Sequence, residues 1–189
     1  NCDLPPAGDS AGQGGQMSSM VVINNGFIYN IGGCTDISTA DECNNGGAAM
    51  SGNVSYAALN SLGQMVAPTT CTSPNTSYGL WCVDNTNRIN GTNGVGTGAA
   101  TVFNNVLYVI GGTDGSDWQA NVWSVTVNAD GSLSGAWTAQ TFTNLDLGTA
   151  RGYSYAFTRA NPASASTYPG NLYVLGGCNG GVTANGVGC

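Results

Sequence analysis

The sequence has no histidine and no lysine, and Lys+Arg total 3 against 10 acidic residues, giving a formal net charge of −7. Without histidine, neither a Ser-His-Asp triad nor a histidine-ligated zinc or copper site can be built. A nucleic-acid-binding protein needs a basic surface to neutralise phosphates, and this composition provides none. The shortage of cations also argues against attachment to anionic lipid. The composition therefore points away from nucleic acids, membranes and histidine-dependent catalysis.

Long apolar runs are missing as well, since the longest, such as residues 106–110, are far too short to span a bilayer. No signal peptide is recognisable, and we interpret Asn1 as a processed or truncated start. Charged residues, which include good surface helix formers, make up only 7% of the chain, whereas there are 30 glycines. The abundant Gly, Asn, Ser and Thr suit short strands and many turns, so we expect an all-β protein.

The cysteines favour disulfide bonds over a metal site, because no CxxC spacing is present. Six of the seven fall into close pairs, Cys34 with Cys43, Cys71 with Cys82 and Cys178 with Cys189. A disulfide across each small loop would contribute about 2–3 kcal/mol in the chain-entropy model. This pattern indicates an oxidising compartment, although sequence alone does not fix the connectivity. Cys2 has no assigned partner.

An apolar segment with a central tyrosine and a terminal double glycine occurs three times, at residues 24–33, 103–112 and 168–177. A second block follows the double glycine in two of the copies, at residues 53–63 and 121–131. A fixed order of similar segments is the mark of a repeat architecture. We therefore interpret the chain as a series of related units.

Each unit is predicted to contain about four antiparallel strands. Residues 20–23 and 26–31 are apolar runs around Asn24-Asn25, and residues 101–103 and 106–110 flank Asn104-Asn105 in the same way. Asparagine tolerates positive φ, so both Asn pairs are expected to form tight hairpin turns. In the third unit, the runs at 153–157 and 172–175 are separated by a long loop rich in Ala, Ser and Pro.

These features resemble the kelch repeat, whose hallmark is an apolar strand ending in Gly-Gly with aromatic residues downstream. The matching glycine pairs are Gly32-Gly33, Gly111-Gly112 and Gly176-Gly177. Trp123 and Trp137 resemble the downstream aromatics, and Tyr56 is the nearest match to Trp123 in the first unit. A cysteine directly follows two of the glycine pairs. In this feature the chain resembles large secreted bacterial kelch surface proteins. The resemblance implies β-propeller blades, each a four-stranded antiparallel sheet.

The chain holds about two and a half to three such units. We divide it into an N-terminal segment, a first unit with a disulfide-tied insertion, a second unit and an incomplete third unit, at residues 1–14, 15–83, 84–146 and 147–189. A blade buries its faces only against neighbouring blades. We therefore expect these units to belong to a larger or assembled propeller, through further blades of a longer chain or through several copies, with an open array as the alternative.

Few residues stand out as a binding site. Asp114, Asp117 and Trp118 share the loop after the second glycine pair, where the carboxylates and the aromatic ring could bind calcium or stack on a sugar ring. The simpler interpretation is a polar propeller loop. Arg88, Arg151 and Arg159 are expected to have structural roles, with Arg88 as a loose counterpart of Arg151.

Three Asn-X-Ser/Thr sequons begin at Asn53, Asn75 and Asn90. Chance alone explains their number in a chain so rich in Asn, Ser and Thr, so they remain candidate glycosylation sites only.

The leading hypothesis is a non-enzymatic module, extracellular or at the cell surface, for adhesion or for carbohydrate or protein recognition, without a cofactor, a metal or insertion into a membrane. The first alternative is a structural subunit of an extracellular filament or coat, in which copies self-assemble. The second is a glycan-acting hydrolase that depends on Asp114 or Asp117.

Overall fold

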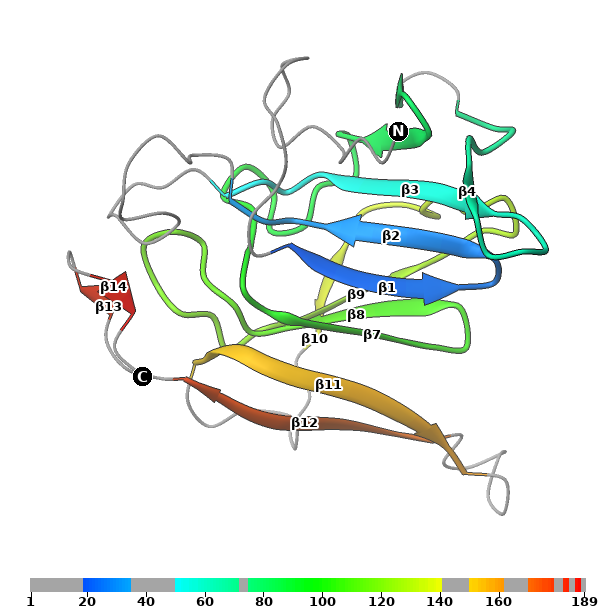
Figure 1. The fold of residues 1–189 in the computed structure, drawn as a ribbon. Helices are drawn as coiled ribbons and strands as arrows, with labels where there is room; N and C mark the ends of the chain where they lie inside the picture. The colour runs from blue at the N-terminus through cyan, green and yellow to red at the C-terminus, as the bar shows by residue number, and fades with distance from the viewer. Residues whose placement is uncertain are drawn as a thin grey trace.

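The computed structural model describes residues 19–34, 50–71, 75–140, 150–161 and 170–178, together with the backbone of 182–183 and 186–187. All regular structure in these ranges is antiparallel β-sheet, as predicted (Figure 1). Within the same ranges, no helix is long and apolar enough to cross a membrane.

The first sheet has six strands rather than the expected four. Its strand order is β1-β2-β3-β6-β5, with β4 paired to β3. The strands are β1 (Met20–Asn24), β2 (Phe27–Ile31), β3 (Val54–Leu59), β4 (Met65–Val66), β5 (Thr76–Tyr78) and β6 (Trp81–Asp84). The difference arises because the disulfide-tied insertion contributes the strands β4, β5 and β6. The Cys71–Cys82 disulfide ties β6 to the chain before β5.

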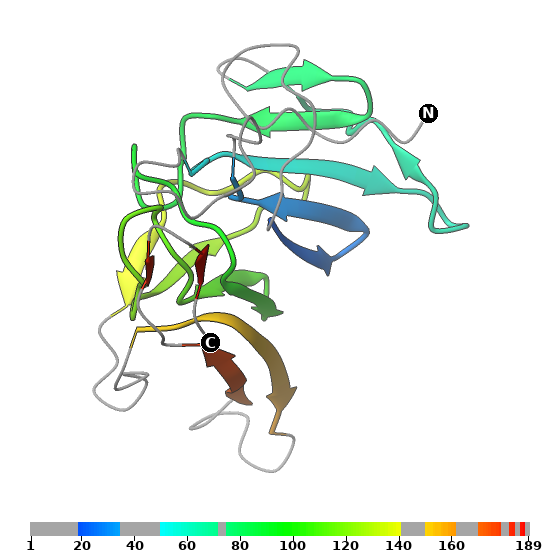
Figure 2. The ribbon, with the colours of Figure 1, turned by 60° about the vertical axis from the view of Figure 1, so that its left-hand side comes forward.

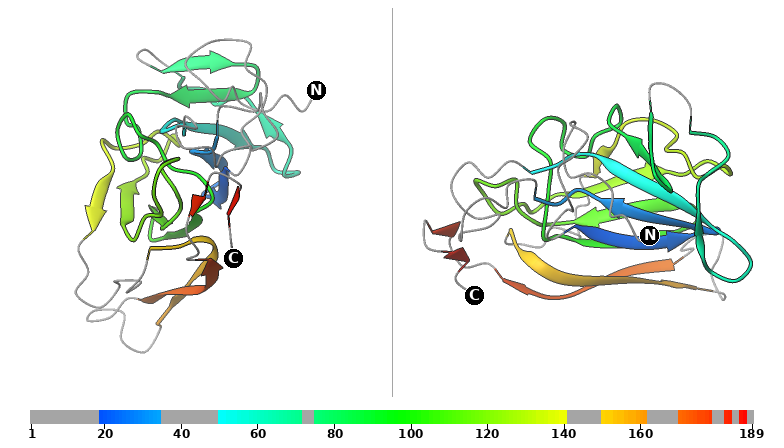
Figure 3. Two further views of the ribbon diagram at one scale, coloured as in Figure 1. Left: turned by 90° about the vertical axis from the view of Figure 1, so that its left-hand side faces the viewer. Right: turned by 45° about the horizontal axis from the view of Figure 1, so that its top comes forward.

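The second sheet is the predicted four-stranded meander, in the order β10-β9-β8-β7. Its strands are β7 (Ala99–Phe103), β8 (Val106–Ile110), β9 (Val122–Thr126) and β10 (Thr138–Gln140). The third sheet is the hairpin of β11 (Gly152–Ala160) and β12 (Gly170–Cys178), and β13 (Val182–Thr183) pairs with β14 (Gly186–Val187). Strand β7 lies between β1 and β11, so the three sheets are stacked in sequence order (Figures 2 and 3).

The hairpin turns follow the predicted chemistry, with one shift of register. Asn104 and Asn105 form the β7–β8 turn with φ of 49° and 61°, as predicted. The β1–β2 turn is Asn25-Gly26 rather than Asn24-Asn25, because Asn24 pairs with Phe27 in the ladder. Gly26 adopts a φ of 78° without a Cβ penalty, so the turn settles where glycine supplies its second residue.

The main core lies between the first and second sheets. Tyr29 and Tyr56 stack with ring centroids 6.1 Å apart in the first sheet, and Leu107 and Trp123 of the second sheet belong to the same buried cluster. The predicted match between Tyr56 and Trp123 is wrong, because the two residues do not occupy the same position in their sheets. Tyr56 lies opposite Tyr29 in the ladder, whereas Trp123 lies opposite Val109, one position out of phase. Side chains alternate along a strand, so the two rings enter one core from opposite sides.

A buried hydrogen bond fixes the turn after β9 to the first sheet. The hydroxyl of Tyr29 donates to the carbonyl of Gly131 over 2.9 Å. A Cβ at Gly131 would lie 2.5 Å from the ring of Phe27. Within the turn, Asp130 Oδ1 accepts hydrogen bonds from the backbone N–H and the hydroxyl of Ser132, at 3.0 and 2.7 Å. The turn thus has a defined shape that meets a specific residue of the neighbouring sheet.

The first two double glycines make close backbone contacts between successive sheets. Gly33 N–H donates to Val95 O over 2.9 Å, and Gly112 N–H donates to Arg151 O over 2.8 Å. Val95 and Arg151 lie just before β7 and β11. Val95, rather than Arg88, therefore holds the position of Arg151 in the earlier repeat. The first two glycine pairs thereby join their own sheets to the segment that leads into the next.

Adding a methyl group at a double glycine should break this contact. Gly111 has a φ of +63°, and a Cβ there would lie 2.3 Å from Arg151 O, whereas Gly63 has a φ of +74° with nothing within 4 Å. Gly111→Ala should lower the free energy of unfolding by about 3 kcal/mol or more, because backbone strain and a clash add. Gly63→Ala, the matched control, should cost about 1–2 kcal/mol from strain alone. Urea unfolding measures both, and equal losses would contradict the close-contact role.

Stability should be flat near neutral pH and fall on both sides. Burial raises the pKa of the Tyr29 hydroxyl, and hydrogen bonds from Ser132 lower the pKa of Asp130. A raised tyrosine pKa gives stability that is lost as the pH rises above the unfolded value of about 10, whereas a lowered carboxyl pKa gives stability that is lost in acid, below about 4. Tyr29→Phe should weaken the alkaline loss and cost about 1 kcal/mol at neutral pH. Unfolding curves across the pH range test this, and an alkaline limb unchanged in the variant would contradict it.

Candidate functional site

The loop after the second glycine pair holds the three residues that we predicted as a ligand site. Asp114 shapes this loop, because its Oδ1 accepts the backbone N–H of Ser116 at 3.0 Å and of Asp117 at 2.8 Å. The Thr113 hydroxyl oxygen accepts the N–H of Gly115 over 3.1 Å. A carboxylate that accepts two local N–H groups has a structural role in the turn.

Asp117 and Trp118 occupy different environments within this loop. The Asp117 side chain is exposed, and its carboxylate accepts no hydrogen bond from another described residue. Trp118 is half-buried and packs over Gly152 at the start of β11, where an added Cβ would lie 2.1 Å from the indole ring. Trp118 therefore also holds the second sheet against the third.

Tyr153 joins this group from the third sheet, and sequence reasoning missed it. Its ring meets that of Trp118 edge to face, with centroids 6.0 Å apart, and 47% of the residue is exposed. Tyr153 has a φ of +54°, and its N–H donates to Thr97 O over 2.7 Å. Tyr153 belongs to this group because it contacts Trp118 of another unit. The pattern of residues along one strand cannot indicate such a contact. We call Asp117, Trp118 and Tyr153 the junction site.

The predicted disulfides are confirmed in part. Cys71 and Cys82 are bonded, with Cα atoms 5.5 Å apart. Cys34 and Cys178 are also disulfide-bonded. Their predicted partners, Cys43 and Cys189, and the unassigned Cys2 lie outside the described residues, so those pairings stay predictions.

The three sequons differ in their access to solvent. Asn53 is buried, with 1% of its surface exposed, so its side chain faces the protein interior. Asn75 and Asn90 are half-buried, and the Asn90 side-chain amide donates to Gly94 O over 3.0 Å. Of the three, Asn75 and Asn90 stay candidates for glycosylation in the folded protein.

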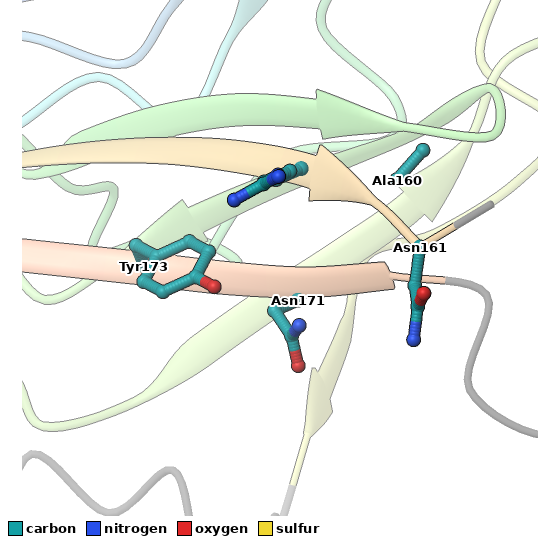
Figure 4. Close-up of a pocket in the computed structure, with 5 residues that line it drawn as sticks. Ala160, Asn161, Asn171 and Tyr173 are labelled. Carbon is teal, nitrogen blue, oxygen red and sulfur yellow. The ribbon is translucent and has the colours of Figure 1, made fainter. Parts of the chain in front are cut away.

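Arg151 connects sheets, as its expected structural role implies. Its carbonyl accepts the N–H of Gly112, and its guanidinium Nη1 donates to Gly176 O over 3.2 Å. Arg159 instead lines a shallow pocket of about 250 Å³ at the far end of the third sheet. The other lining residues are Ala160, Asn161, Asn171 and Tyr173, from β12 and the end of β11 (Figure 4). Arg159 lies opposite Asn171 in the ladder. The sequence alone did not predict this pairing, because it did not define where the loop between the two strands begins and ends.

Comparison with protein families supports the repeat. The model of the family described as the Kelch motif matches residues 97–125, which include β7, β8 and nearly all of β9. A solved structure entitled "Structure of YjhT" is similar at 16% sequence identity with a TM-score of 0.48. The similarity covers 93% of this chain and 42% of that one, so this chain spans less than half of that length. No curated protein matches the chain.

The loop geometry predicts different effects at its two aspartates. Asp114→Ala should lower the free energy of unfolding by about 1–2 kcal/mol, because two backbone N–H groups lose their acceptor. Asp114→Asn keeps an oxygen acceptor and should cost less. Asp117→Ala should leave stability unchanged within about 0.5 kcal/mol, as is usual for an exposed site. Thermal and urea unfolding of the three variants tests this, and an Asp117→Ala loss equal to that of Asp114→Ala would contradict it.

Proposed function

We propose that this kelch-repeat chain, built of β-propeller blades, is a non-enzymatic recognition module that acts outside the cell or at its surface. Kelch repeats generally mediate protein interactions. The proposal adds that the module serves in adhesion or in binding a carbohydrate or a protein, and that the junction site carries the contact.

The observation that carries the proposal is the composition of the junction site. An exposed carboxylate, Asp117, lies beside Trp118 in one loop, and Trp118 makes an edge-to-face contact with Tyr153 of the neighbouring sheet. Aromatic rings with a polar neighbour suit both sugar rings and protein hot spots, since they give contact area at low entropic cost. Loops held by a rigid scaffold are common places for binding.

Two features support the remaining parts of the proposal. The Cys71–Cys82 disulfide favours an oxidising compartment, and therefore an extracellular or surface location. Catalysis is disfavoured because the chain has no histidine and because the turn already uses the carboxylate of Asp114. Glycan hydrolysis, the enzymatic alternative, would need Asp117 and a second free carboxylate on the scissile bond.

Binding to a panel of immobilised neutral and acidic oligosaccharides tests the junction site directly. Asp117→Ala and Tyr153→Asn should each weaken the binding at least about tenfold, as expected for loss of a central contact. Asparagine tolerates the positive φ at position 153, so this variant keeps the backbone while removing the ring.

The matched control is Leu62→Ser, because Leu62 is 79% exposed in a turn of the first sheet, away from the junction site. This variant should bind as the unaltered chain does. Binding that survives both junction variants would contradict the assignment of the site, and release of sugar from the panel would contradict a non-enzymatic role.

A further inference from the structure

The third sheet presents an apolar face that no described residue covers. Alternate residues of β11 and β12 lie on this face, which we call the front face of the third sheet. Exposure is 79% for Tyr155, 46% for Phe157, 39% for Tyr173 and 56% for Leu175. The rings of Phe157 and Tyr173 stack with centroids 5.0 Å apart. A contiguous group of large apolar side chains in this exposure range marks an interaction surface.

The ladders show that this face is a repeat of one that is buried elsewhere in the molecule. The central tyrosines Tyr29 and Tyr173 occupy matching ladder positions, opposite Val22 and Phe157. Ladder position by ladder position, Tyr155 corresponds to Met20 and Leu175 corresponds to Ile31.

Three of the four counterparts in the first sheet are buried under the second sheet, and Val22, the counterpart of Phe157, is half-buried against the same core. Met20 is 4% exposed, and Tyr29 and Ile31 are 0% exposed, because the second sheet lies over them. The front face of the third sheet thus has the construction of a face that receives a further sheet.

A matching open face lies at the other end of the stack. Val21 and Ile23 of β1 are each 57% exposed on the side of the first sheet that points away from the second. Their ladder counterparts in the second sheet, Ala100 and Val102, pack against the core shared with the first sheet. We call the side that holds Val21 and Ile23 the back face of the first sheet.

The open part of the back face is apolar and lies mainly along β1. Asn30, Ser55 and Ala57 of the same face are already buried, and Ile28 is half-buried, which leaves Val21 and Ile23 as its exposed apolar side chains. None of the described acidic residues, Asp84, Asp114, Asp117 and Asp130, lies on either face. No carboxylate of the described residues therefore opposes this contact.

The exposed apolar area of the front face is about half of that of a standard interface, so we expect weak association. An aromatic side chain carries about 150–250 Å², so the exposed parts of three rings and one leucine amount to roughly 400 Å². A standard interface buries about 800 Å² per partner. In the proposed interface, Arg159, Asn171 and the backbone would contribute further area as a polar rim.

We propose that the front face of the third sheet docks onto the back face of the first sheet in a second copy of this chain, so that copies stack head to tail. This contact continues the two interfaces already present, in which the front face of one sheet meets the back face of the next. An interface between different faces leaves one of each face free, so copies either close a ring or extend a series. Two copies would supply six sheets, within the four to eight blades typical of propellers. The proposal is independent of the junction site.

Sedimentation velocity and light scattering test the stacking on the whole chain, from about 1 to about 100 µM, because even standard interfaces can be as weak as micromolar. The mass should rise from 19.0 kDa to multiples of that value. Tyr155→Glu on the front face and Ile23→Glu on the back face should each stay monomeric. Leu62→Glu, whose 79% exposure equals that of Tyr155 but on neither face, should associate as the unaltered chain does.

Mixing the two face variants distinguishes head-to-tail docking from every other contact. Each variant keeps one intact face, so an equimolar mixture should form a dimer that neither forms alone. An unaltered chain that stays monomeric throughout would overturn the proposal and leave the face to another occupant, such as a further sheet of the same polypeptide or a ligand. Association of either variant alone, or a mixture that stays monomeric, would also overturn it. Far-UV circular dichroism confirms that each variant is folded, with Phe157→Ser as the alternative front-face change.

Discussion

Close backbone approach at the double glycines is the constraint on which the rest of the structure depends. A Cβ on Gly32 would lie 2.1 Å from Val95 O, and one on Gly111 would lie 2.3 Å from Arg151 O. At this separation the next N–H can donate across the boundary, as those of Gly33 and Gly112 do. The start of each new sheet is therefore fixed by the end of the second strand of the preceding one, and the inter-sheet core forms in the space so defined.

The polar interactions of the core also fix the position of the second sheet relative to the first. The hydroxyl of Tyr29 reaches a carbonyl in a turn of the second sheet, whose shape Asp130 and Ser132 maintain. A buried hydroxyl without this acceptor would be costly, so the turn and the tyrosine stabilise one arrangement of the two sheets. Few charged residues are needed, because Asn and Asp side chains satisfy the loop backbone locally.

Much of the fold was predictable, because the relevant signals are local. The β7–β8 turn follows from the tolerance of Asn104 and Asn105 for positive φ, and the strands follow from short apolar runs between such turns. The Cys71–Cys82 bond joins residues close in sequence, so its spacing indicated it. The shift of the first turn to Asn25-Gly26 and the strands β4 to β6 were missed, because both depend on which ladder forms around them.

The sequence by itself determined the β class, the repeat, the tight turns and the absence of histidine chemistry, since each is a property of neighbouring residues or of composition. Only the tertiary structure decided which side chains share a surface. It brought Tyr153 to Trp118 across two units, showed that Asp114 is used by its own loop, and left Tyr155 and Leu175 exposed where Met20 and Ile31 are buried. The physical reason is that alternation along a strand assigns a residue to one of two faces, but only the stacking of sheets determines whether that face is covered.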